Sequence, residues 1–212
     1  QVAGNMGGSI EPTFKEGLPN LYCGIFSILL MFLYLMAKEV RLRDKICAVG
    51  LLLFFNVSFI IRQLDYIWHG FHFTNMIPYR FSFLYSFVVL FMAYRAWTLR
   101  RTLGSKRIVL AGVLAAAVLA CSNQLTETVP LELFGREWNI HLYFIYNLIF
   151  LVLYLLAMLA GSITETAPEG ATPREIARIR LEVHQQSLRS RALILGIMVV
   201  ELTANLICFG LY

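Results

Sequence analysis

The stretch Ile140–Gly161 reads IHLYFIYNLIFLVLYLLAMLAG and contains no acidic residue, lysine, arginine or proline. The hydrocarbon core of a bilayer is about 30 Å thick, so a helix needs roughly 20 mostly apolar residues to cross it. This stretch therefore predicts a transmembrane helix. Segments of about ten residues that alternate between apolar and polar side chains, as barrel strands do, are not visible in the chain. Helices are the spanning elements that we expect.

The composition of the whole chain favours the same class. Its 212 residues are 58% hydrophobic and 15% charged, and their mean hydropathy is +0.68. Soluble domains carry roughly 45–50% apolar and about 25% charged residues. We therefore predict an all-α integral membrane protein in which lipid is the solvent for most of the chain.

Further apolar stretches predict about six transmembrane helices in all. Residues 1–20 are polar and rich in glycine, and we expect them to form a loop on the outer face. The six predicted spans cover residues 21–37, 46–64, 79–93, 108–122, 140–161 and 192–212. The segment from Leu125 to Asn139 holds Pro130 and three acidic residues, so a loop or an interfacial stretch is expected there.

One long polar insert, residues 164–191, separates the last two predicted spans. Thr172, Pro173 and Glu175 stand in the order of a capping box with a first-turn proline, which predicts the start of a helix. Apolar residues share one face of this helix and arginines flank it, as in an amphipathic helix on an anionic membrane surface. A solvated extension of the last span fits the pattern equally well.

The distribution of basic residues predicts the orientation. The net charge is +5, but the charges lie in short loops and form no stripe, so nucleic-acid binding is not expected. The loops after the first, third and fifth spans hold four, five and five of the eighteen lysines and arginines. Basic loops are retained in the cytoplasm. Both chain ends are therefore predicted outside, and the insert 164–191 inside.

Polar and aromatic residues gather around the outer ends of the second and third spans. Arg80 is predicted to open the third span, where its guanidinium can hold a phosphate through two parallel hydrogen bonds. His69, Asn75 and Tyr79 are further donors in the same stretch. The alternative is an anchoring arginine whose side chain extends to the lipid headgroups.

Two other residue pairs in this stretch have a polar role. Arg62 and Asp65 are three positions apart and can pair on one helical face, either beside a ligand or as a structural pair under an aromatic belt. His69 and His72 could begin a metal site, but a catalytic zinc needs a third protein ligand and an open position. No third candidate stands at a suitable spacing. We therefore predict neither a metal nor another cofactor, and assign the histidines to hydrogen bonding with a polar ligand.

Glu201 is an acidic residue within the sixth predicted span. Asn205 follows four positions later, so both side chains point the same way inside the membrane. An acid at that depth must face protein or water and is a functional candidate. A link between helices is an equally good interpretation, because asparagine commonly has that role.

Other motifs give little support to soluble-enzyme chemistry. The chain has no nucleophile elbow, Walker A motif, dinucleotide-binding glycine pattern or H-E-x-x-H motif. Its cysteines lie in or beside apolar runs without a C-x-x-C pair, which indicates packing residues. They are Cys23, Cys47, Cys121 and Cys208.

Three blocks of residues resemble the YfhO family of bacterial membrane proteins. The first is Phe14–Gly24 (FKEGLPNLYCG), and the last is Glu201-Leu202 with Asn205. Between them, Ile67–Phe83 combines Trp-His-Gly-Phe with Asn75 and Pro-Tyr-Arg-Phe-Ser-Phe, and this block is the specific one. The blocks follow the family's order over essentially the whole chain.

The resemblance implies a membrane domain similar to the GT-C glycosyltransferases, in the bacterial cell membrane. Those enzymes move a sugar from a polyprenyl-phosphate carrier at the outer face, and family members are linked to decoration of cell-wall polymers such as teichoic acids. It also implies that the catalytic base lies upstream of Gln1 and that members continue past Tyr212. We therefore expect an internal fragment whose catalytic residue is unknown.

Two other functional classes remain as alternatives to a transferase. A transporter would show paired half-helices broken by glycine or proline in two repeats, and none is visible. A structural membrane subunit would need no outer cluster of arginine, histidine, asparagine and tyrosine. The partners that we expect are the lipid bilayer, a polyprenyl-phosphate-linked sugar and a cell-wall polymer as acceptor.

Overall fold

The computed structural model describes residues 21–71, 79–123, 129–133, 136–140, 142–162 and 172–210. These residues are mostly helical, as the sequence predicted, and each predicted span overlaps at least one helix. The elements are α1 (Ile25–Met36), α2 (Leu42–Ile60), α3 (Arg62–Trp68), α4 (Ser82–Thr98), α5 (Ser105–Asn123), β1 (Val129–Leu133), β2 (Arg136–Ile140), α6 (Leu142–Ala160) and α7 (Pro173–Gly210).

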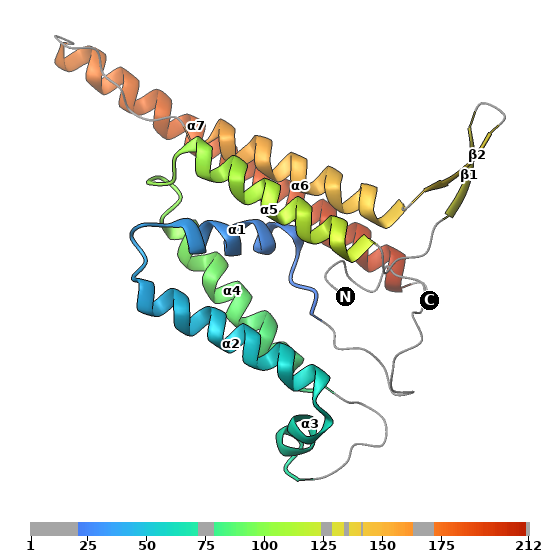
Figure 1. Cartoon of the computed structure of the whole chain (residues 1–212). Coiled ribbons are helices and arrows are strands. Elements are labelled where there is room, and N and C mark those ends of the chain that lie inside the picture. The colour runs from blue at the N-terminus through green and yellow to red at the C-terminus, as the bar shows by residue number, and fades with distance from the viewer. Residues whose placement is uncertain are drawn as a thin grey trace.

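Helix α1 lies in the middle of the bundle (Figure 1) and packs against α4, α5 and α6. It is apolar on all sides, and a helix of that kind lies in a protein core or in a membrane. Leu29 and Leu33 are completely buried. At a rise of 1.5 Å per residue its 12 residues span about 18 Å, which is less than the hydrocarbon core.

One helix in the described part of the chain is long and apolar enough to cross a membrane. It is the segment Ser105–Ser122 within α5. The segments Ile25–Met36 and Phe144–Ala160 are apolar but shorter. The prediction of six spans therefore remains a prediction, although the helical class of the fold is confirmed.

A short hairpin stands where the sequence predicted a loop or an interfacial stretch. Strands β1 and β2 pair antiparallel, with Val129 opposite Ile140 and Leu133 opposite Arg136. Apolar residues at every second position of VPLEL are the signal for this strand. Proline and the acidic residues conceal that signal, because both are rare in strands. Ile140 thus belongs to β2, and α6 begins at Leu142.

Helix α7 is continuous from the polar insert into the last predicted span. Thr172 forms the predicted capping box: its N–H donates to Glu175 Oε2 at 2.8 Å, and the Glu175 N–H donates to Thr172 Oγ1 at 3.4 Å. The first half of the helix projects beyond the bundle (Figure 1). The helical part of the insert is therefore an extension of the last predicted span, whereas its placement at a membrane surface or in solvent stays a prediction.

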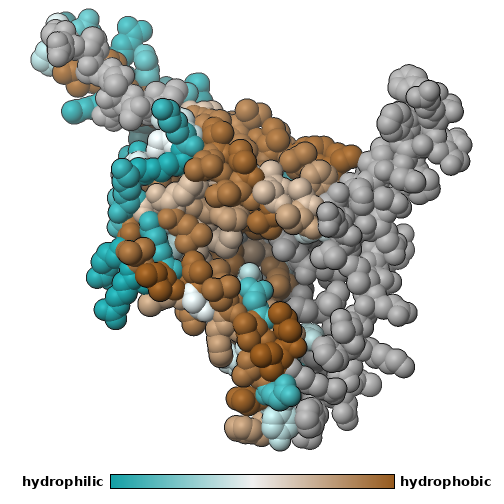
Figure 2. Space-filling model, in the orientation of Figure 1, coloured by the Kyte–Doolittle hydropathy of each residue, from teal (hydrophilic) through white to brown (hydrophobic). Residues whose placement is uncertain are grey.

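The three basic connections meet at one end of the bundle. The Ser105 and Ser162 hydroxyls are 3.1 Å apart, which joins the start of α5 to the end of α6. The backbone N–H of Glu39 and the Thr102 side chain hold the pKa of Glu39 below its usual range, so the α1–α2 connection lies close to the α4–α5 connection. Polar residues gather at this end in Figure 2.

Apolar side chains cover the helices between the two ends of the bundle (Figure 2). Ile60 is 76% exposed and Leu206 72%, and many other leucines, valines and phenylalanines are exposed with them. A soluble monomer rarely leaves so much contiguous apolar surface in water. Cys47 and Cys121 also lie on this exposed surface, so the prediction that they are packing residues is wrong. Cys23, half-buried, is free as well.

Candidate functional site

An aromatic cluster joins the two motifs of the specific sequence block. Phe81 stacks on Phe59 from α2 (ring centroids 5.1 Å apart, planes at 13°) and on Trp68 from α3 (5.0 Å, 17°). Phe55 contacts both Trp68 and Phe81, and Tyr79 meets Phe59 edge to face. We use the name aromatic cluster for these five residues. It brings the Trp-His-Gly-Phe motif against Pro-Tyr-Arg-Phe.

The helices meet at this cluster because α2 stops early. The sequence predicted a span up to residue 64, but α2 ends at Ile60 and the backbone of Ile61 is extended. A short separate helix, α3, then carries Asp65 toward the cluster. Aromatic residues from three elements bury one another there, and rings at these distances add about 0.5–1.5 kcal/mol per pair beyond the area that they bury.

Asp65 holds the turn that leads to Arg80. The Tyr79 N–H donates to Asp65 Oδ1 at 3.3 Å. Tyr79 has a φ of 64°, a left-handed conformation that costs a residue with a side chain on the order of 1–3 kcal/mol. The hydrogen bond and the burial of the tyrosine ring offset that cost. Asp65 thereby determines the direction in which the chain enters α4.

Arg80 follows directly and its side chain is exposed. Arg80 was predicted to open the third span, but it lies in the turn before α4, which begins two residues later at Ser82. In the part of the chain that the structure describes, Arg80 forms no ion pair or side-chain hydrogen bond. Its guanidinium therefore keeps all its donors available for a ligand.

The His69 side chain is 8% exposed and lies beside Asp65, and one of its ring nitrogens is unpaired among the described residues. Its Nδ1 lies 2.8 Å from the Asp65 carbonyl oxygen and 3.4 Å from Asp65 Oδ1. A carbonyl oxygen can only accept, so Nδ1 carries the proton. Nε2 is buried and has no partner among the described residues. It accepts a hydrogen bond when the ring is neutral and donates one when the ring is protonated.

The remaining predicted site residues cannot be placed in this cluster. The Arg62 side chain, Asn75 and His72 lie outside the described residues. The predicted pairing of Arg62 with Asp65 is therefore untested, whereas Asp65 does pair with Tyr79 and His69. Among the described residues, no group of three potential ligands is placed to hold a metal ion.

Glu201 forms a second polar centre, where α1, α6 and α7 meet. Glu201 is 2% exposed, and its carboxylate accepts three hydrogen bonds. Oε1 accepts from the Tyr22 hydroxyl at 2.7 Å and from the Ile25 N–H at 2.9 Å. Oε2 accepts from the Tyr154 hydroxyl at 2.6 Å. All partners are donors, which suits an ionised carboxylate, and a carboxylate is favourable at a helix N-terminus such as that of α1.

Asn205 completes this network, as its spacing from Glu201 suggested. Its amide nitrogen donates to the Glu201 carbonyl oxygen at 2.9 Å and to the Tyr22 hydroxyl. Gly24 precedes α1 with a φ of 83° and directs the Ile25 N–H toward the carboxylate. The sequence analysis missed Tyr22 and Tyr154. A tyrosine in an apolar span carries a hydroxyl that needs a partner, and that was the available signal.

The chain also matches a known protein family over nearly its whole length. The family model described as bacterial membrane protein YfhO matches residues 2–209. The chain belongs to the YfhO family. This confirms the resemblance seen in the sequence and identifies a bacterial membrane protein, which places the exposed apolar surface in the lipid bilayer. No curated protein and no solved structure matches the chain.

Proposed function

We propose that this YfhO chain is part of a membrane glycosyltransferase. It takes a sugar from a polyprenyl-phosphate carrier at the outer face and decorates a cell-envelope polymer. The observation that carries the proposal is the exposed guanidinium of Arg80, which forms no ion pair among the described residues and directly follows Tyr79, the residue whose N–H donates to the half-buried Asp65. A phosphate ester needs charge-assisted donors at the membrane surface, and arginine supplies two parallel ones.

The neighbouring residues have separate roles in this proposal. His69 donates from Nε2 to the carrier phosphate when its ring is protonated, with Asp65 beside Nδ1. Asp65 and Tyr79 are positioning residues, because they act through the turn that holds Arg80. His72, Asn75 and Arg62 are additional carrier contacts in the proposal. The catalytic base is not assigned to any residue of this chain.

The proposal includes an orientation with six spans, both chain ends outside and the insert 164–191 inside. Helix α2 supports it, because it carries the basic connection at one end and leads to Asp65 at the other. To test this orientation, the native cysteines are first replaced. A membrane-impermeant thiol reagent added outside is expected to label Gly8→Cys and to spare Gly104→Cys. The reverse labelling would place the Arg80 site on the cytoplasmic side and refute the proposal.

The phosphate role is tested with Arg80 variants of the full-length protein in lipid nanodiscs. Charge-assisted hydrogen bonds contribute about 1.5–3 kcal/mol each, so Arg80→Ala should weaken binding of a polyprenyl-phosphate sugar by roughly ten- to a hundredfold. Arg80→Lys keeps the charge but loses the two parallel donors, and should fall between wild type and Arg80→Ala. Fluorescence titration with a labelled carrier measures the affinities.

The matched control is Arg43→Ala, which removes an exposed arginine at the other end of α2. It should leave carrier binding within about twofold of wild type. If Arg80→Ala and Arg80→Lys both bind the carrier as tightly as wild type, Arg80 is an anchor for lipid headgroups and the phosphate role is wrong.

A further inference from the structure

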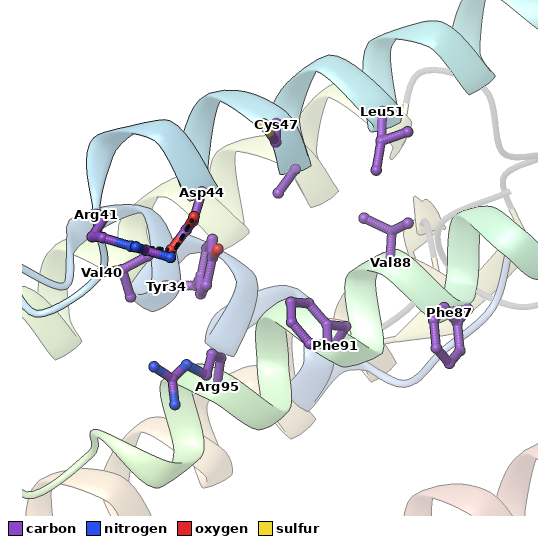
Figure 3. A pocket seen from close by; sticks show the side chains of 11 residues that line it. Tyr34, Val40, Arg41, Asp44, Cys47, Leu51, Phe87, Val88, Phe91 and Arg95 are labelled. Carbon is purple, nitrogen blue, oxygen red and sulfur yellow. Dashed lines mark hydrogen bonds and ion pairs between the residues drawn. The ribbon is translucent and has the colours of Figure 1, made fainter.

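A groove of about 530 Å³ lies between α2 and α4, away from both polar centres. None of the residues predicted from the sequence as site residues lines it. Its volume falls within the range of about 300–1,000 Å³ that is typical of small-molecule sites. In Figure 3, Leu51 of α2 faces Val88 and Phe91 of α4 across the groove, and Tyr34 of α1 lies between the two helices.

The groove is apolar over most of its length and charged at one end. Leu51 of α2 and Phe87, Val88 and Phe91 of α4 line the apolar part. The charged end lies where α2 begins and α4 approaches its last turn, which is the end where the basic connections meet. Figure 3 places Arg41, Asp44 and Arg95 together there. A ligand that fits has one apolar chain and a polar head at the basic end.

The charges at this end favour an anionic head. Arg41 pairs with Asp44, with Nε 3.1 Å from Oδ2. Arg95 lines the same end and forms no ion pair within the described residues. Two guanidinium groups and one carboxylate leave one uncompensated positive charge. The pair is exposed, so a phosphate can compete with Asp44 for Arg41 at small cost.

We propose that this groove binds an anionic phospholipid of the surrounding membrane. One acyl chain lies between Leu51 and Phe91, and the headgroup phosphate lies between Arg95 and Arg41. Helix α2 has 19 residues and spans about 28 Å, so this site is separate from Arg80. The proposal of a lipid site and the proposal of a carrier site can therefore be refuted independently of each other.

The test uses the full-length protein in nanodiscs and phosphatidylglycerol with a photoreactive group on its acyl chain. Cross-links are expected on α2 and α4 around Leu51 and Phe91. Unlabelled phosphatidylglycerol should compete for the site, whereas zwitterionic phosphatidylcholine and free inorganic phosphate should not. Equal competition by phosphatidylcholine would overturn the proposal, and so would competition by phosphate alone. Protection of the groove by another protein segment or a second copy would overturn it as well.

Two charge variants should change the affinity in opposite directions. Arg95→Gln removes the unpaired cation and should weaken phosphatidylglycerol binding about fivefold, the effect of roughly one basic residue near a lipid headgroup. Asp44→Asn removes the competing carboxylate and should tighten binding by about two- to fivefold. Arg101→Gln, at the same end but outside the groove, is the control and should change little. Affinities that do not differ among the three variants would contradict the proposed headgroup contact.

Discussion

The polar centres at Glu201 and at Arg80 differ in whether their hydrogen bonds are satisfied. The Glu201 carboxylate accepts from two tyrosine hydroxyls and one backbone N–H, all from within the bundle. Arg80 is exposed, and within the described part of the chain neither its guanidinium nor His69 Nε2 has such a partner. The first centre is closed by the protein itself. The second has donors left for a ligand.

The comparison separates two interpretations that the sequence left equal for Glu201. A buried acid with three internal donors links helices, because every oxygen already has a partner and no space for a substrate is needed. The carboxylate also accepts the first N–H of α1, which a short buried helix could not otherwise satisfy in the absence of water. Glu201 is therefore best understood as the residue that secures α1 against α6 and α7.

The largest effect on stability is predicted for Glu201→Ala. Three donors lose their acceptor, and hydrogen bonds between membrane helices are worth roughly 0.6–1.7 kcal/mol each. The free energy of unfolding should fall by about 2–5 kcal/mol, as measured by equilibrium unfolding of the full-length protein in bicelles. Glu201→Gln retains one acceptor oxygen and should have an intermediate effect, because its amide group places a donor against a hydroxyl.

Two controls make this comparison sharp. Leu202→Ala changes an exposed neighbour of Glu201 on the same helix, and Arg80→Ala changes the polar centre at Arg80. Both should alter the free energy of unfolding by about 0.5 kcal/mol or less. If Arg80→Ala destabilises the protein as much as Glu201→Ala, or if Glu201→Gln keeps stability but abolishes carrier binding, the assignment of the two centres must be reversed.

An intermediate effect on stability and on carrier affinity is predicted for Asp65. It belongs to the polar centre at Arg80 but acts through hydrogen bonds within the protein. Asp65→Ala removes the acceptor of the Tyr79 N–H, so the left-handed turn relaxes. Unfolding should become easier by about 1 kcal/mol, and carrier affinity should fall about tenfold. Asp65→Asn keeps a carbonyl oxygen for that N–H and should bind within about threefold of wild type.

The asparagine variant decides between geometry and charge at this position. If Asp65→Asn loses as much carrier binding as Asp65→Ala, the negative charge itself is needed, either to pair with protonated His69 or to take a proton. Binding of the carrier by both variants as tightly as by wild type would show that the turn before α4 does not position Arg80.

Much of the fold could be predicted from the sequence, because apolar length and capping chemistry are local signals. The stretch Ile140–Gly161 predicted α6 to within two residues at its start, and Thr172 predicted the first turn of α7. The break at Ile61 could not be predicted in this way. The apolar run ends at Ile61 and the polar residues Arg62 and Gln63 follow it, but such residues also occur within helices and do not predict a break. The stacking of Trp68 on Phe81 holds α3 at the aromatic cluster, and no local pattern predicts that contact.

The candidate site was predicted as a set of residues and less well as an arrangement. Asp65 and His69 are four positions apart on one stretch, so their contact is consistent with helical spacing, whereas the hydrogen bond from the Tyr79 N–H to Asp65 joins residues fourteen positions apart. Tyr22 and Tyr154 are far from Glu201 in the chain, and no local pattern links a hydroxyl on one helix to an acid on another. The lipid groove was missed for the same reason, because its two walls come from separate helices.

The smallest effect is predicted for the exposed counterpart of Glu201 at the start of α7. There Glu175 accepts from the Thr172 N–H and hydroxyl, and hydrogen bonds from Thr172 hold the pKa of Glu175 below its usual range. A lowered pKa means that the ionised form supports the folded helix start. The support is complete above the ordinary pKa of a glutamate, about 4.3, and is lost as the pH falls through the lower pKa in the folded protein.

NMR titration of the Glu175 and Thr172 amide signals measures the pH at which this support is lost. Thr172→Ala should return the titration of Glu175 toward the ordinary range. The global free energy of unfolding should barely change in that variant, because water replaces these exposed hydrogen bonds. An unchanged titration of Glu175 in Thr172→Ala would show that the capping box does not cause the shift in pKa.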